Sequence, residues 1–372
     1  MSRETRYDLG LIIPTREEFD YVRECIPLVP ITGEDNRYWY EFPIPGDRTG
    51  VVHVLFDMGL TVAASGATRL LDRFDPEVLA VLGIGGALGG DLRLGDVVVG
   101  SAVQEYLKAA RASPDAAGHT TFQPAGDAWP LAERLRSFTA HFPYVAEAQH
   151  DSWIRSARAR GVNDGLPLST THGARRAPSY SLQPIASGDV LVTDPAFRDW
   201  LLSHDRKRGI VEMEAAGAAR TVKEHDRGTD LLVLRGVSDF ADARKDTLDA
   251  TSAGRQGQID TGGAWRRYAT QNAAELLLTF LASPRFPWRR TPSRTAQQRI
   301  LERISGGGER VPPRALQIWD YFARAAQVVE VTGAVITIGE AVRTHFSHPD
   351  VPASDHPGYD PDGHAYNDGY HL

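Results

Sequence analysis

Residues 231–240 read LLVLRGVSDF, an apolar run that ends abruptly in polar residues. A continuous apolar run is typical of a β-strand whose two faces are both covered by helices, as in a parallel sheet. We therefore predict a buried strand over Leu231–Gly236, with Ser238 and Asp239 at its carboxyl end. Ligands of open parallel sheets bind outside the carboxyl ends of the strands, where a catalytic acid would lie. The alternative is that Ser238 and Asp239 only cap a following helix.

Working outward, short β-rich runs alternate with amphipathic stretches over most of the chain. The other predicted strands are Tyr7–Ile13, Val51–Asp57, Val78–Gly83, Asp96–Gly100 and Gly209–Met213. The predicted helices are Arg16–Ile26, Val62–Phe74, Ala128–His141, Ala196–His204, Glu214–Asp226 and Gly263–Leu281. Strands and helices that alternate at this spacing predict an α/β fold with a mostly parallel mixed sheet.

Composition limits the kinds of protein that this chain of 372 residues can be. With 41 basic and 48 acidic residues its formal net charge is −7, which argues against a general nucleic-acid-binding protein. Hydrophobic residues make up 42%, enough for a large core. The single cysteine, Cys25, excludes an intrachain disulfide framework and fits a reducing compartment. The N-terminal apolar stretch Leu9–Ile13 is too short for a signal-peptide core, and the longest apolar run, Val78–Leu88, is too short for a membrane helix, so we expect a soluble cytoplasmic protein.

The glycine-rich segment Gly83–Gly90 follows a predicted strand. The dinucleotide-binding fingerprint requires glycine at its sixth position, where this segment has Leu88, so that fingerprint is absent. Glycines at a strand end still allow a ligand to approach the backbone closely. The alternative is a tight turn between packed elements.

Carboxylates stand at two further strand ends. VEMEAAG (211–217) reads as a switch from strand to helix and carries Glu212 and Glu214. IIPTREEF (12–19) shows the same order of strand, turn and helix start, with Glu18 in the first helical turn. For both segments the alternative is a solvated acid that only complements the helix dipole. Several acids at strand ends of one sheet are stronger evidence for a site than any one of them.

In this order along the chain, the segments resemble the purine nucleoside phosphorylase/nucleosidase superfamily over roughly residues 7–282. Among its members, the chain is most similar to 5′-methylthioadenosine/S-adenosylhomocysteine nucleosidases and to nucleosidase-like domains of larger sensor or effector proteins. The most specific pieces are VEMEAAG (211–217) and LRGVSDFAD (234–242), supported by 83–88, 94–99 and 186–192. The resemblance implies a three-layer phosphorylase/hydrolase-like fold and a homodimer or higher homo-oligomer.

The resemblance also implies three catalytic residues. Asp239 matches the general acid that protonates the departing purine, and Ser238 lies beside it and would orient it. Glu18 matches the base that activates the attacking water.

Substrate-binding roles follow from the same resemblance. Glu214 matches the carboxylate that binds the ribose hydroxyls, and Met213 matches the residue that packs under the sugar. Leu191 and Val192 match positions that border the purine, whereas Ile84 replaces a serine that nucleosidases often carry, so one polar contact is missing. The full predicted set is Glu214, Met213, Glu212, Ile84, Gly85, Leu191, Val192 and Arg235.

The chemistry is consistent with these roles. Cleavage of an N-glycosidic bond passes through an oxocarbenium-like state, as glycoside hydrolysis does. The leaving base needs an acid and the attacking water needs a base, while a third carboxylate favours the positive charge that develops on the sugar. No metal or other cofactor is required. We therefore predict hydrolysis of a purine nucleoside or nucleotide, with an adenine compound as the expected substrate.

Two other functions stay open from the sequence: phosphorolysis, and a nucleoside-sensing module without turnover. Phosphorylases of the superfamily typically carry a Gly-Asp-Pro plus Arg pattern after the first strand. Here that place reads IPTREE (13–18), which favours hydrolysis. Arg16 either lies on the surface or meets a phosphate of a nucleotide substrate.

The predicted domain organisation has four parts. Residues 1–282 form the nucleosidase-like domain, and 283–294 (SPRFPWRRTPSR) form a linker. Residues 295–346 form a small helical region that weakly resembles a winged helix; the alternative is a helical appendage that packs on the main domain. The polar tail 347–372 is expected to be disordered, and its scattered His and Asp residues would bind a metal only weakly.

Overall fold

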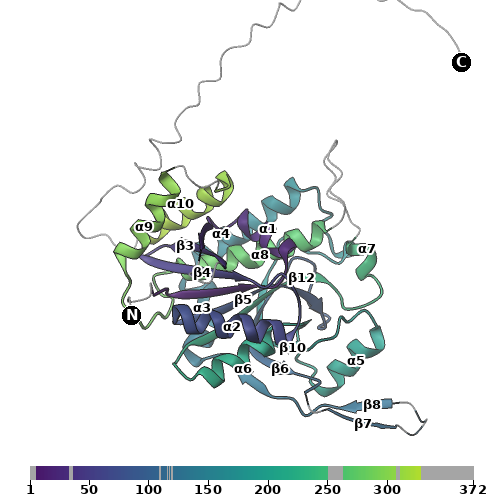
Figure 1. Ribbon diagram of the computed structural model, residues 1–372. Coiled ribbons are helices and arrows are strands. Elements are labelled where there is room, and N and C mark those ends of the chain that lie inside the picture. Colours follow the sequence, from purple (N-terminus) through teal and green to yellow (C-terminus); the bar gives the residue numbers. More distant parts are fainter. Residues whose placement is uncertain are drawn as a thin grey trace, which may run out of the picture. The chain divides into compact units, whose positions relative to one another are not determined.

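The computed structural model describes residues 6–32, 37–108, 110–114, 116, 118, 120–249, 263–306 and 311–327. In this part of the chain, helices cover both faces of a ten-stranded mixed sheet (Figure 1). The strands of this sheet are β1 (Leu9–Ile13), β2 (Val29–Thr32), β3 (Tyr38–Ile44), β4 (Arg48–Val54), β5 (Val78–Ala87), β6 (Val97–Glu105), β9 (Ala128–Pro130), β10 (Tyr180–Ser187), β11 (Ile210–Glu212) and β12 (Asp230–Asp239). A separate hairpin pairs β7 (Arg111–Pro114) with β8 (Thr120–Gln123).

The helices lie between these strands in the sequence and extend beyond the last of them. They are α1 (Arg16–Arg23), α2 (Leu60–Phe74), α3 (Glu133–Val145), α4 (Glu147–Asn163), η1 (Thr170–His172), α5 (Pro195–His204), α6 (Ala215–His225), α7 (Lys245–Asp249), α8 (Ala264–Leu281), α9 (Arg294–Ser305) and α10 (Pro313–Gln327).

The sheet follows the order β11-β10-β6-β12-β5-β1-β4-β3-β2, with β9 paired to β6. Its centre is parallel, because β1 runs parallel to β4 and β5, and β5 runs parallel to β12. The edge β4-β3-β2 is antiparallel. The predicted α/β fold with a mostly parallel mixed sheet is confirmed.

One pairing bends half of this sheet into a closed ring. Strand β11 pairs parallel with β10 and also antiparallel with β5. Consequently β5, β12, β6, β10 and β11 form a ring of neighbouring strands. This closure brings the ends of β5, β11 and β12 together, although they are far apart in the sequence.

The two faces of the sheet bury different side chains of the same strand. On β1, Leu9, Leu11 and Ile13 pack with the hydrophobic cluster that includes residues of α1, α3 and α8. Ile12 points the other way, into the cluster with α2 and α6. Both sets are fully buried, because successive side chains of a strand point to opposite faces. This explains why the sequence of the strand is continuously apolar.

All six predicted strands are present, but six other strands of the described residues were missed and one predicted helix begins too early. Strand β2 contains Pro30, which weakens a strand signal but is tolerated at the sheet edge, where β2 lies. Strands β3 and β10 and the hairpin strands β7 and β8 were also missed. The helix predicted from Ala128 begins only at Glu133, because residues 128–130 form β9 and pair with β6 instead. Tertiary pairing overrides local helix propensity there.

Residues 283–294 pack against the sheet domain. Phe286 is buried and lies 5.3 Å from the ring of Phe138, centroid to centroid. The backbone N–H groups of Arg289 and Arg290 donate hydrogen bonds to the buried carboxylate of Glu77 at 2.5 and 2.8 Å. The division into a domain at 1–282, a linker and a region at 295–346 stays a prediction. Residues 328–346 of the predicted helical region and the tail 347–372 lie outside the described residues.

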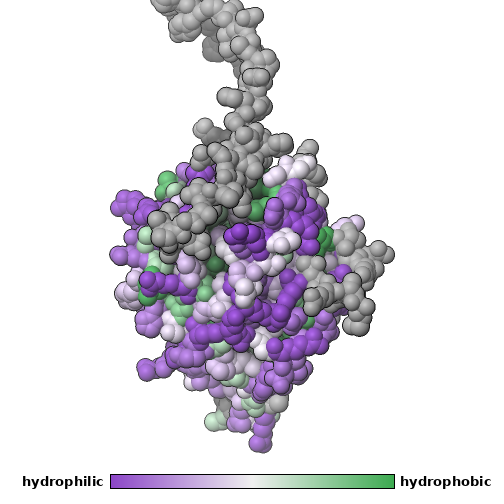
Figure 2. Space-filling view, turned by 90° about the vertical axis from the view of Figure 1, so that its left-hand side faces the viewer, coloured by the Kyte–Doolittle hydropathy of each residue, from purple (hydrophilic) through white to green (hydrophobic). Residues whose placement is uncertain are grey.

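The surface on the left-hand side of Figure 1 is mainly hydrophilic (Figure 2). None of the helices in the described ranges combines the length and the apolar character needed to cross a membrane.

Replacement of Phe286 by alanine tests whether residues 283–294 are part of the folded domain. We expect Phe286→Ala to lower the free energy of unfolding by about 3 kcal/mol, because it leaves a cavity among buried aromatic rings. Urea unfolding followed by circular dichroism measures this. The control Val162→Ala, on an exposed position of α4, should change stability by less than about 0.5 kcal/mol. Equal stability of the Phe286→Ala and wild-type proteins would mean that the segment is a free linker.

Candidate active site

A cavity of about 250 Å³ opens where the carboxyl ends of β1, β5, β11 and β12 meet. All the predicted site residues line it, with the exception of Arg235. Glu18, Glu214 and Asp239 reach the cavity from α1, from the start of α6 and from the end of β12. The lining residues are Pro14, Thr15, Glu17, Glu18, Tyr21, Met58, Ile84, Gly85, Gly86, Val190, Leu191, Val192, Val211, Glu212, Met213, Glu214, Ser238, Asp239, Lys245 and Arg266.

Arg235 lies behind the cavity, within the sheet, and is 1% exposed. Its Nη2 donates a hydrogen bond to Glu214 Oε2 at 3.0 Å and another to Glu212 Oε2. On the neighbouring strand, a Cβ at Gly83 would come within 2.3 Å of Arg235 Nη1 and 2.4 Å of Glu18 Oε1. Only glycine at position 83 leaves room beside this strand for the Arg235 guanidinium and the Glu18 carboxylate. Arg235 is therefore the counterion of a buried acidic cluster, which we call the Arg235 cluster: Arg235, Glu18, Glu212 and Glu214.

Glu18 is held by groups on two strand ends. Its Oε2 accepts hydrogen bonds from the backbone N–H (3.0 Å) and hydroxyl (2.8 Å) of Thr15, which form a capping box at the start of α1. Its Oε1 accepts one from the backbone N–H of Ile84 at 2.9 Å. Burial raises the pKa of the Glu18 carboxyl, and the charge of Arg235 opposes that rise. The contribution of Ile84 to this site therefore comes from its backbone.

Glu214 faces the cavity beside Arg235, and its Oε1 accepts a hydrogen bond from the backbone N–H of Gly59 at 3.2 Å. Burial raises the pKa of the Glu214 carboxyl to about 7, with the nearby charges of Glu212 and Glu18 adding to the rise. The attraction of Arg235 works against them. Near neutral pH this carboxyl therefore exists in both protonation states.

Glu212 has a structural task in addition to lining the cavity. Its carboxylate accepts hydrogen bonds from the backbone N–H groups of Glu214 and Ala215, at 3.0–3.1 Å. These are unpaired donors at the start of α6, where a negative charge is favourable. With its Arg235 contact, this leaves Glu212 fully engaged within the protein.

Asp239 lies at the end of β12 and is 3% exposed. Its Oδ2 accepts hydrogen bonds from the Ser238 hydroxyl at 2.9 Å and from Lys245 Nζ at 3.0 Å. Its Oδ1 accepts one from the backbone N–H of Ala241 at 2.9 Å. The sequence reasoning missed Lys245, because an isolated lysine six residues after an acid gives no recognisable pattern.

Residues 83–87 of the glycine-rich segment form the end of strand β5, and a bend and a turn follow at Gly89 and Gly90. A Cβ at Gly85 would come within 2.6 Å of the backbone oxygen of Val211, and one at Gly86 within 2.7 Å of Asp239 Oδ1. The two glycines thus allow β11 and Asp239 to approach β5 closely. They set the spacing of the cavity wall.

A family profile described as the phosphorylase superfamily matches residues 8–282. The chain belongs to this superfamily. The match covers the sheet, the cavity and the Arg235 cluster, which fits the resemblance expected from the sequence.

Individual relatives cover less of the superfamily domain. An ATP nucleosidase, Cap17, from Escherichia coli strain KTE188 is 29% identical over 209 residues, which are 54% of this chain and 38% of that protein. The 5′-methylthioadenosine/S-adenosylhomocysteine nucleosidase of Maridesulfovibrio salexigens is 44% identical over 63 residues, 16% of this chain and 27% of that protein. The chain thus spans well under half the length of both. The structure of a Neisseria meningitidis nucleosidase of the same name overlaps with 73% of this chain and 97% of its own, at TM-score 0.48 and 21% identity.

The rim of the cavity carries a cluster of polar side chains that the sequence analysis did not predict. Arg266 at the start of α8 pairs with Glu17 at 3.0 Å, and the Tyr21 hydroxyl donates to the same carboxylate at 2.7 Å. Arg16, in contrast, has 83% of its side chain exposed and pairs with Asp20 at 3.9 Å. It does not line the cavity, so of the two positions considered for it, the surface position is the observed one.

The buried carboxyl of Glu214 predicts a pH-dependent stability. The folded-state pKa of Glu214, about 7, lies above the ordinary value of 4.5. The carboxyl therefore stabilises the folded state below pH 4.5, and this contribution to the free energy of unfolding is lost as the pH rises through 7. Glu214→Gln removes this dependence. We expect the stability of Glu214→Gln relative to wild type to increase between pH 4.5 and 7, by up to about 3 kcal/mol.

Urea unfolding at several pH values measures this difference. Glu133→Gln, at an exposed position of α3, is the matched control and should follow wild type at every pH. Parallel curves for Glu214→Gln and wild type would contradict a raised pKa.

Proposed function

We propose that the chain hydrolyses the N-glycosidic bond of a purine nucleoside or nucleotide, with adenine as the expected base. The observation that carries this proposal is the convergence of Glu18, Glu214 and Asp239, from three separate strand ends, on one cavity of about 250 Å³. Three carboxylates match the three needs of the reaction: a proton for the base, an activated water and a favourable charge near the sugar. The two relatives named as nucleosidases support the same reaction class.

In this proposal Asp239 protonates the departing purine, and Ser238 orients it. The Ser238 hydroxyl, the Lys245 ammonium group and the N–H of Ala241 fix the carboxyl of Asp239 in one position. A fixed position matters because proton transfer requires hydrogen-bond distance to the accepting nitrogen. The base then leaves as a neutral molecule instead of an anion.

Glu18 activates the attacking water in the proposal. Because burial raises the pKa of its carboxyl, its ionised form is a stronger base than a carboxylate in water. Thr15 and Ile84 occupy three hydrogen-bonding positions of the carboxylate, so its orientation is set before the substrate binds. Such preorganisation lowers the cost of reaching the transition state.

Glu214 would bind the ribose hydroxyls, Met213 would pack under the sugar, and Leu191 and Val192 would border the purine. All four line the cavity. Near neutral pH, Glu214 is present partly as carboxylate and partly as acid, so it can accept a hydrogen bond from one hydroxyl or donate one to it. Its ionised form favours positive charge on the sugar.

The cations that line the cavity pair with acidic side chains, and this favours hydrolysis over phosphorolysis. Lys245 contacts the carboxylate of Asp239, and Arg266 contacts that of Glu17. Arg16 points away from the cavity. A phosphate site needs arginines and N–H groups directed at the anion, and these cations already have acidic partners.

The assembly and location of the protein remain part of the proposal. Met58 and Leu191 line the cavity with 50% and 59% of their surface exposed. Large apolar side chains at a cavity mouth favour cover by a second copy, which supports a homodimer or larger homo-oligomer.

The single cysteine, Cys25, is buried and free, which fits the expected reducing cytoplasm.

Replacement of either proposed catalytic carboxyl should stop base release. We expect Asp239→Asn and Glu18→Gln each to lower kcat by about a hundredfold to ten-thousandfold, since each removes one proton-transfer step. Chromatography of free adenine and hypoxanthine measures the rate, and thermal unfolding shows whether each variant is folded. Asp199→Asn and Glu133→Gln, at exposed positions, are the matched controls and should keep the wild-type rate.

Unchanged activity of either variant would overturn its assigned role. Nucleoside binding without any base release by wild-type protein would favour a sensing module instead.

Omission of phosphate separates the two reaction types. With adenosine, 5′-methylthioadenosine, S-adenosylhomocysteine, AMP and ATP as substrates, we expect adenine release at the same rate with and without phosphate. The expected sugar product carries a free hydroxyl group at C1. A sugar 1-phosphate, formed only when phosphate is present, would identify a phosphorylase. The preferred substrate would show whether a nucleoside or a nucleotide fits the cavity.

A further inference from the structure

Lys245 of α7 places an ammonium group against the proposed general acid. Its Nζ lies 3.0 Å from Asp239 Oδ2, and its side chain is 12% exposed, so the pair is largely shielded from water. Both side chains line the candidate active site. The ammonium group thus lies where a departing purine would need a proton.

The hydrogen bonds around Asp239 all use its carboxylate as an acceptor. Oδ2 accepts from the Ser238 hydroxyl and from Lys245, and Oδ1 accepts from the backbone N–H of Ala241. Accepting from three donors is the role of an ionised carboxylate, which has no proton of its own to give. Among these three donors, the ammonium group of Lys245 is a far stronger acid than a hydroxyl or an amide N–H. It is therefore the group from which a proton can reach the purine through Asp239.

The charges along the cavity run in the direction that this transfer needs. The Arg235 cluster, at the sugar in the proposed function, holds three carboxylates and one guanidinium group. Asp239 and Lys245 form a pair of opposite charges at the base, and Glu17 and Arg266 pair with each other. Without the ammonium group, ionised Asp239 would repel the electron pair that moves from the glycosidic bond into the purine. Lys245 removes that repulsion and brings a proton to the same place.

Building on the proposed function, we infer that Lys245 supplies the proton that leaves with the purine and that Asp239 passes it on. As the bond between C1 of the sugar and the purine nitrogen breaks, its electron pair moves into the purine ring. A proton moves from Nζ to Oδ2 of Asp239 and from there to a ring nitrogen of the purine, which leaves as a neutral molecule. Lys245 is left as an uncharged amine, and Glu18 takes up one proton from the attacking water. The protein as a whole therefore neither gains nor loses a proton, and both groups exchange with solvent after the products leave.

Two substitutions of Lys245 separate the supply of a proton from the positioning of Asp239. Lys245→Arg keeps a positively charged donor beside Asp239, but a guanidinium group does not release its proton in proteins. Lys245→Met removes both the charge and the donor. With the adenine compound that wild-type protein cleaves fastest, we expect both variants to lower kcat about a hundredfold. A Lys245→Arg variant with the kcat of wild type would mean that Lys245 only holds Asp239 in place, and the inference would be wrong.

The N7-methylated form of the same substrate shows whether the loss concerns the proton. Its base already carries a positive charge, so it leaves as a neutral molecule without taking up a proton. On this substrate we expect both Lys245 variants to stay within about threefold of the wild-type kcat, because no acid is needed. Chromatography of the free base measures both reactions after subtraction of spontaneous cleavage. Equal losses on the two substrates would indicate a structural role of Lys245 and would overturn the inference.

Lys207→Met, at an exposed position that does not line the cavity, is the matched control and should keep the wild-type kcat on both substrates. Thermal unfolding shows whether each variant is folded. If wild-type protein releases no base from either substrate, the proposed function fails, and the role of Lys245 fails with it. If wild-type protein releases the base and the Lys245 variants do so at the same rate, only the role of Lys245 is lost.

Discussion

Arg235 places a positive charge among Glu18, Glu212 and Glu214 with almost no exposure to water. Each carboxylate would be costly to bury alone, and the guanidinium would be equally costly without them. The cluster therefore holds together as a unit. Because its members come from β12, α1, β11 and the start of α6, their pairing fixes four separate strand and helix ends in one arrangement. Burial raises the pKa of Glu214, and the other two carboxylates of the cluster add to that rise.

The closed ring of strands gives this cluster its surroundings. Because β11 pairs with both β10 and β5, the strand that ends at Glu212 is held from two directions. Gly83, Gly85 and Gly86 make the close approaches possible, each at a point where a Cβ would collide with a neighbour. The glycine-rich segment thus shapes the candidate site, because the missing side chains let its neighbours come close.

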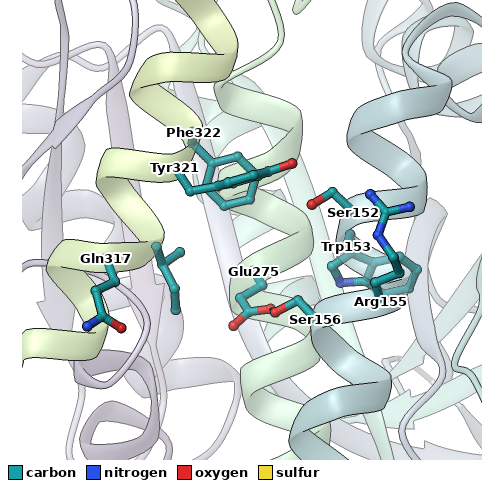
Figure 3. Close-up of a pocket in the computed structure, with 9 residues that line it drawn as sticks. Ser152, Trp153, Arg155, Ser156, Glu275, Gln317, Tyr321 and Phe322 are labelled. Carbon is teal, nitrogen blue, oxygen red and sulfur yellow. The ribbon is translucent and has the colours of Figure 1, made fainter.

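Helices α1 and α8 connect the candidate active site with a second cavity, of about 390 Å³, which lies between α4, α8 and α10 (Figure 3). Glu18 near the start of α1 faces the first cavity, while Glu24 at its end accepts hydrogen bonds from Arg267 and Gln271 of α8 at 2.6 and 2.9 Å. Helix α8 continues to Glu275, at the second cavity. The packing of α10 beyond the superfamily domain is what encloses this second cavity, so it is a feature of the region added to the shared fold.

The sequence by itself determined the α/β class, most of the central strands and the three carboxylates Glu18, Glu214 and Asp239 that meet at the first cavity. Apolar runs that end in acidic residues indicate a buried strand and the position of its end. Both are local properties of the sequence. Only the tertiary structure decided that Arg235 lies behind the cavity, that Lys245 contacts Asp239 and that Arg16 faces solvent. These outcomes depend on which strands become neighbours and how close they come. That information resides in pairings between distant segments, such as β11 with β5, and no local pattern of residues carries it.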